Sequence, residues 1–159
     1  MPESKTRFPI GFALVLGVSA ALCVAVLVDA LTIRTGGGEA VIAAAYEGMF
    51  LLAGLWLSLI VLLIMAGAMG EMPSAGGWAA FFLVPVSAIA AFVALDACSR
   101  NLRGAAIFPV AFAGLIAFYA TWARAPSLRA SLTAKDATRT VWGGVLVLSA
   151  FAFLVGALF

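Results

Sequence analysis

The chain has 159 residues, of which 65% are hydrophobic and 10% are charged, and its formal net charge is +2. Soluble domains are about 45–50% apolar and about 25% charged, so this composition excludes an ordinary water-soluble core. The small net charge gives no indication of nucleic-acid binding. The chain contains no histidine, which removes the usual general base near neutral pH and a common metal ligand.

Five long apolar runs account for most of the chain, and they are residues 8–33, 40–69, 76–98, 104–123 and 141–159. A helix needs about 20 apolar residues to cross a hydrocarbon core of about 30 Å. Most breaks between the runs are short, so we expect consecutive helices to pack as antiparallel hairpins. The sequence therefore predicts an all-α, polytopic integral membrane protein. Its five transmembrane helices form one domain over residues 1–159, with no separate soluble domain.

The first run, residues 8–33, follows the basic residues Lys5 and Arg7. The apolar region of a signal peptide has about 7–15 residues, so we interpret this longer run as a retained helix. Asp29 lies near its end, and Arg34 follows it. An ionisable side chain within a membrane helix is costly, which makes Asp29 a candidate for function.

The second run, residues 40–69, is too long for an upright span. Thirty residues at about 1.5 Å each reach about 45 Å, so this helix has to tilt, protrude or begin in the interface. Glu47 lies about 10 Å along its axis and is the acid furthest from any helix end. Gly54 and Ser58 in the same run are small enough to allow close approach of another helix.

The third run, residues 76–98, contains Pro85, which we expect to kink the helix because it removes a backbone hydrogen bond. Asp96 lies near the end of this run and is followed by Arg100 and Arg103. Four small residues recur at helical spacing and form a candidate face for helix packing or for a partner: Ser87, Ala91, Ala94 and Cys98.

The last two runs carry no acid, and residues 124–140 between them are predicted to form the longest loop. Leu128 and Leu132 recur in this loop at i and i+4, among basic residues. This pattern fits a short interfacial helix that touches anionic headgroups. A plain solvated loop explains it equally well.

The distribution of Lys and Arg favours a cytoplasmic N-terminus and an external C-terminus. Six of these residues then lie inside and three outside: Lys5, Arg7, Arg124, Arg129, Lys135 and Arg139 against Arg34, Arg100 and Arg103. Trp78, Trp122 and Trp142 fall at the proposed inner boundary, as an interfacial belt would. The Ala- and Gly-rich composition, with more Arg than Lys, is typical of a GC-rich bacterial source, so we expect the inner membrane.

One group of ionisable residues gathers at the outer ends of the first three predicted helices: Asp29, Glu47, Asp96, Arg34, Arg100 and Arg103. Three interpretations are open. The acids could form a polar pocket for a proton, a cation or a small polar solute. They could form an arginine–carboxylate network that orients the helix ends. Glu47 could instead pair with a cation on a partner subunit.

No motif for nucleotide binding, hydrolysis or metal ligation occurs in the sequence. Cys23 and Cys98 form no ligand set, so we expect no cofactor, no metal and no catalytic residue. The leading interpretation is a small non-catalytic accessory, assembly or stabilising subunit of a larger membrane complex. A proton, ion or small-solute transporter or channel is the alternative, and a membrane enzyme comes third. The expected partners are membrane lipids and either other membrane subunits or further copies of the chain.

Overall fold

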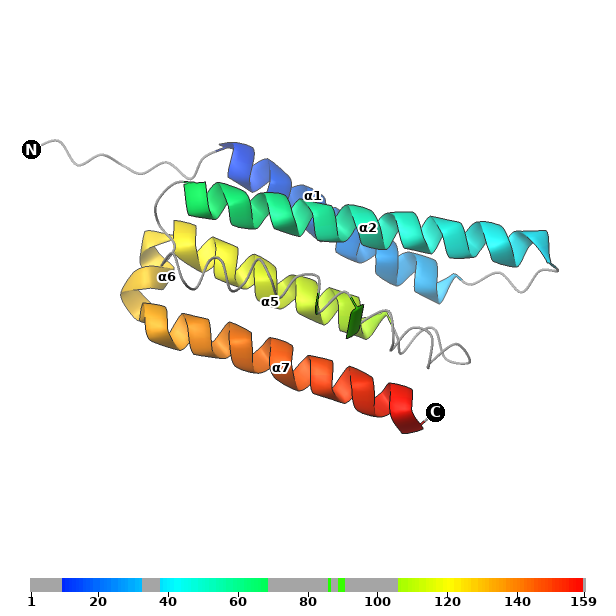
Figure 1. The fold of residues 1–159 in the computed structure, drawn as a ribbon. Coiled ribbons are helices and arrows are strands. Elements are labelled where there is room, and N and C mark those ends of the chain that lie inside the picture. Colours follow the sequence, from blue (N-terminus) through cyan, green and yellow to red (C-terminus); the bar gives the residue numbers. More distant parts are fainter. Residues whose placement is uncertain (1–9, 33–37, 69–85, 87–88, 91–105, 159) are drawn as a thin grey trace, which may run out of the picture.

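The structure is a computed structural model, and it describes residues 10–32, 38–68, 86, 89–90 and 106–158. The described part of the chain is all-helical and contains five helices (Figure 1). They are α1 (Ile10–Leu31), α2 (Glu39–Ala68), α5 (Ile107–Arg124), α6 (Pro126–Ser131) and α7 (Ala134–Leu158). All except α6 are long and apolar enough to cross a membrane. The chain is therefore a multi-pass membrane protein.

Three of the predicted helices are confirmed, with ends that differ by at most three residues from the prediction. The runs 8–33, 40–69 and 104–123 correspond to α1, α2 and α5. The predicted helix 76–98 lies outside the described residues except for residues 86, 89 and 90. Its kink at Pro85 and its face of small residues, Ser87, Ala91, Ala94 and Cys98, therefore stay predictions.

Of the two interpretations of residues 124–140, the plain loop is wrong, because the short helix α6 fills the first half and α7 begins at Ala134. The interfacial position of that short helix stays a prediction. The start of α7 is fixed by a reciprocal cap. The Thr133 hydroxyl donates to the Asp136 carboxylate and accepts the Asp136 backbone N–H at 3.2 Å. A Ser or Thr followed three residues later by an acid is a helix-start signal, which hydropathy alone overlooks. The last helix therefore contains an acid, Asp136, contrary to the prediction.

Thr133→Ala is expected to lower the free energy of unfolding by about 1 kcal/mol, because the cap of α7 is lost. Unfolding of the purified protein in mixed micelles, followed by circular dichroism as sodium dodecyl sulfate is added, measures this. Thr138→Ala is the matched control. The Thr138 hydroxyl bonds only to the Ala134 carbonyl within the helix, so its loss should cost under about 0.5 kcal/mol. Equal effects would contradict a capping role for Thr133.

Helix α5 lies at the centre of the described bundle (Figure 1). It packs against α1, α2, α6 and α7, and half of its residues are buried. The fully buried side chains on it include Phe112, Ile116 and Tyr119. Pro109 is the third residue of α5, where its missing N–H leaves no helical hydrogen bond unmade. The packing of the other helices is therefore organised around α5.

Small residues set how closely the helices approach. A Cβ atom at position 144 would lie 2.7 Å from Leu115 Cδ1, so a larger residue there requires the Leu115 side chain to turn aside or α7 to move away from α5. Gly143, its neighbour, has nothing within 4 Å of the corresponding position. Of these two glycines, Gly144 therefore serves packing within the bundle.

The α1–α2 pair is joined by a buried polar contact between two serines. Ser19 Oγ lies 2.8 Å from Ser58 Oγ and 3.0 Å from the Val15 carbonyl oxygen. The Ser58 hydroxyl donates to the Leu55 carbonyl oxygen at 2.8 Å. A Cβ atom on Gly54 would lie 3.7 Å from Leu22 of α1. Ser58 thus makes the close helix contact expected from the sequence, and the helix that approaches is α1 of the same chain. Gly54 faces the same helix, at a distance where a Cβ atom would make ordinary van der Waals contact.

Candidate functional site

Two of the predicted acids, Asp29 and Glu47, come together at one end of the α1–α2 hairpin. Asp29 lies near the end of α1 and is half-buried. A Cβ atom at position 48 would lie 3.3 Å from Asp29 Oδ2, so the carboxylate rests against the bare backbone of Gly48. Glu47 directly precedes Gly48 in α2, so its backbone lies next to the one that the Asp29 carboxylate contacts. Two acids therefore lie near each other on two neighbouring helices.

The Glu47 side chain lies on the outer surface of the hairpin. It is exposed, as are its neighbours on α2, Tyr46, Met49 and Phe50. The apolar span in α2 begins at Ile42, so Glu47 is about 7.5 Å inside it along the helix axis. A carboxylate at this depth among exposed apolar side chains needs a route to water or a partner that offsets its desolvation.

The remaining members of the predicted group, Arg34, Asp96, Arg100 and Arg103, lie outside the described residues. The arginine–carboxylate network therefore stays a prediction. The described basic residues occupy the opposite end of the bundle, where α5 ends and α7 begins (Figure 1). They are Arg124, Arg129, Lys135 and Arg139. None of these four can reach the two acids.

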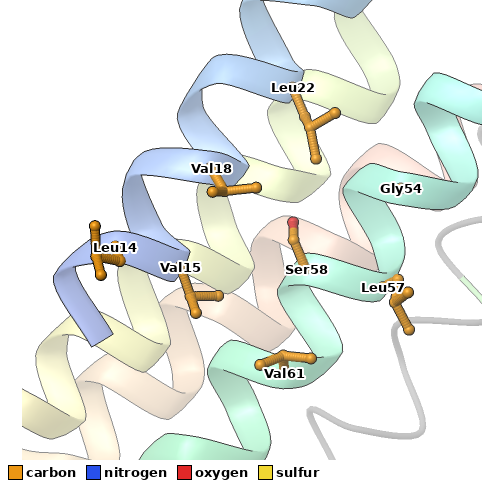
Figure 2. A pocket seen from close by; sticks show the side chains of 8 residues that line it. All are labelled: Leu14, Val15, Val18, Leu22, Gly54, Leu57, Ser58 and Val61. Carbon is orange, nitrogen blue, oxygen red and sulfur yellow. The ribbon is translucent and has the colours of Figure 1, made fainter. Parts of the chain in front are cut away.

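An open groove of about 330 Å³ lies between α1 and α2 (Figure 2). Ser58 contributes the one hydroxyl among its eight lining residues: Leu14, Val15, Val18, Leu22, Gly54, Leu57, Ser58 and Val61. That hydroxyl already bonds to Leu55 and meets Ser19. The groove therefore offers van der Waals contact and no free polar group. Sequence reasoning found its small residues, Gly54 and Ser58, but not the groove.

Trp122 lies near the end of α5, at the opposite end of the bundle from the two acids. Its indole N–H donates to the Leu132 carbonyl oxygen at 3.1 Å, and its ring stacks on Tyr119 with centroids 5.7 Å apart. Trp122 is buried, so it packs inside the bundle and does not face lipid as a belt residue would. The short helix predicted as one alternative for residues 124–140 is present as α6. Leu128 and Leu132, the two residues that suggested it, pack against the protein core.

The described residues contain no group of three or more His, Cys, Asp or Glu side chains that could hold a metal ion. Cys23 is a half-buried free thiol packed against the core. Comparison with protein-family models, with curated proteins and with solved structures finds no match for this chain. The class of the protein, a multi-pass helical membrane protein, therefore follows from its own helices.

Proposed function

We propose that the chain is a small non-catalytic accessory, assembly or stabilising subunit of a larger membrane protein complex. The observation that carries the proposal is the position of Glu47. It stands exposed on α2 among exposed apolar side chains, beside a second acid, Asp29. A neighbouring subunit that brings a basic side chain to this surface would offset both negative charges.

A charged side chain in hydrocarbon is costly to insert. Insertion scales give about 2.5–3.5 kcal/mol for a charged residue at the centre of a span, and less toward its ends. The mutual repulsion of Asp29 and Glu47 adds to this cost. A cation from a partner helix removes the repulsion and also supplies hydrogen bonds to the carboxylate oxygens. The exposed Phe50 and Tyr46 rings beside Glu47 provide the apolar contact that such an interface needs.

Glu47→Gln is expected to release the partner subunit, because the substitution removes the charge while keeping the size of the side chain. The tagged chain is purified from its native membrane in mild detergent, and the stoichiometry of co-purifying polypeptides is measured. Loss of one charge-assisted contact of about 2–3 kcal/mol lowers affinity by roughly 30–150-fold.

The matched control for this substitution is Glu39→Gln. Glu39 is also an exposed acid on α2, but it is the first residue of that helix, two turns from Glu47. The control should retain the partner at the wild-type ratio. Purification of the wild-type chain without any stoichiometric foreign subunit would overturn the proposal.

A transporter or channel for protons, ions or small solutes is the second candidate, and the proximity of Asp29 to Glu47 on the neighbouring helix favours it. Two acids that repel each other form a natural site for a cation or a shared proton. This candidate requires that the purified chain alone moves a cation or protons across liposome membranes, and that Glu47→Gln abolishes the flux. A flux that is unchanged in the variant would remove Glu47 from the pathway.

We further propose five membrane spans, with a cytoplasmic N-terminus and an external C-terminus, in a bacterial inner membrane. Helices α2 and α5 run in the same direction (Figure 1), so one more crossing between Ala68 and Ile107 would account for their order. The described basic residues gather at the end where α7 begins, and the acids Asp29 and Glu47 lie at the other. This charge distribution supports the orientation.

The topology is tested with reporter fusions. Alkaline phosphatase, which is active only outside the cytoplasm, should be active when fused after Phe159 and inactive when fused after Ser131. Green fluorescent protein should show the reverse pattern. Activity of alkaline phosphatase at both positions, or at neither, would contradict a single crossing by α7.

A further inference from the structure

One face of α7 changes from basic to aromatic to apolar along its length. The residues on it follow at intervals of four, three, four, four and three: Lys135, Arg139, Trp142, Leu146, Ala150 and Phe153. This spacing places all six on one side of a helix. Trp142 is half-buried and the other five are exposed. Helix α7 packs against α5 through a different face, whose buried residues include Ala137, Val141 and Val145.

The basic end of this face is net positive. Asp136 is the one acid among the described residues at this end of the bundle, its carboxylate accepts the Thr133 hydroxyl in the cap of α7, and four basic residues outnumber it there. Lys135 and Arg139 are one helical turn apart, so both can reach the same anion. This pair therefore has the charge and spacing to hold one phosphate group.

The spacing of these residues along the axis of α7 matches the dimensions of one phospholipid in one leaflet of the bilayer. Arg139 and Trp142 are about 4.5 Å apart along the axis, and Trp142 and Phe153 about 16.5 Å apart, at about 1.5 Å per residue. Half of a hydrocarbon core of about 30 Å is about 15 Å. Trp142 then lies at the interface, where tryptophan is favoured, and Phe153 lies near the midplane.

We propose that this face of α7 is a binding site for a single anionic phospholipid. The phosphate lies against Lys135 and Arg139, and one acyl chain follows Leu146, Ala150 and Phe153, with the small Ala150 leaving room between the larger side chains. An acidic peptide or a free phosphate would use the basic pair but leave the apolar part of the face without an occupant. This site is at the opposite end of the bundle from Glu47 and is independent of the proposed partner interface.

The test is lipid retention by the whole purified chain. The protein is taken from nanodiscs that contain equal amounts of phosphatidylglycerol and phosphatidylcholine, and bound lipids are counted by native mass spectrometry. The wild-type chain should retain one phosphatidylglycerol in preference to phosphatidylcholine. Lys135→Gln combined with Arg139→Gln should reduce that retention by at least about tenfold, because each surface charge contributes to anionic-lipid binding. The charge-conserving variant, Lys135→Arg combined with Arg139→Lys, should retain the lipid as the wild-type chain does.

Arg129→Gln is the matched control, because Arg129 is exposed at the same end but lies on α6 and off this face. It should change retention by less than about twofold, whereas an equal loss from Arg129→Gln and Arg139→Gln would show a diffuse charge effect and overturn the site. Phe153→Ala should weaken retention while leaving the preference for phosphatidylglycerol. Inorganic phosphate at millimolar concentration should not displace the lipid, and displacement would identify a phosphate site in place of a lipid site.

Discussion

Gly144→Leu is expected to displace the Leu115 side chain or move α7 away from α5, and to lower the free energy of unfolding by about 1 kcal/mol. Even a Cβ atom at this position would lie 2.7 Å from Leu115 Cδ1 and 3.0 Å from Leu115 Cδ2. A leucine extends further into the space that Leu115 occupies. Titration with sodium dodecyl sulfate in mixed micelles, followed by tryptophan fluorescence, measures the loss.

Gly143→Leu is the control for this substitution, because position 143 has nothing within 4 Å. The control carries the same change in helix propensity and should lie within about 0.5 kcal/mol of the wild type. Leu115→Ala, introduced into the Gly144→Leu chain, should recover part of the lost stability by opening the space that the new side chain needs. Equal stability of the two glycine variants would contradict the α5–α7 contact.

Phe112→Ala is expected to lower the free energy of unfolding by about 2–3 kcal/mol. Phe112 is fully buried in α5, the helix that all the other described helices contact. Phe→Ala costs about 3–5 kcal/mol in water-soluble cores. A smaller value is expected here, because helices that separate in a membrane or micelle remain surrounded by apolar chains. The loss of stability then comes mainly from lost packing contacts.

The comparison for Phe112 is Phe153→Ala, which removes the same ring from a position that is 47% exposed. The unfolding measurement in mixed micelles should show less than about 0.5 kcal/mol of destabilisation for this variant. A larger loss at position 153 than at position 112 would mean that α5 is not the centre of the bundle.

Hydropathy was sufficient to predict α1, α2 and α5, because each fills one apolar run of bilayer length. It also predicted the apolar part of α7 but placed the start of this helix seven residues too late, because two polar turns precede the apolar run. There the local chemistry of Thr133 and Asp136 decides where the helix begins. The pair Thr133 and Asp136, three residues apart, marks this helix start in the sequence where hydropathy does not.

The candidate site was predictable only in part. The hairpin connection between α1 and α2 was enough to place Asp29 and Glu47 at the same end. The exposure of Glu47 was not predictable, because α2 is apolar on every side and its pattern does not distinguish a lipid-facing surface from a protein-facing one. The contact of Asp29 with Gly48 depends on the register between the two helices, which the sequence does not encode in any single motif.

The central claim is that the surface around Glu47 meets another protein in the membrane. Photo-crosslinking in intact membranes tests it most directly, with p-benzoylphenylalanine in place of Phe50, which is 76% exposed beside Glu47. The account predicts one crosslinked foreign polypeptide, which disappears when Glu47→Gln is added and persists when Glu39→Gln is added. Crosslinks to lipid alone at position 50 would contradict it.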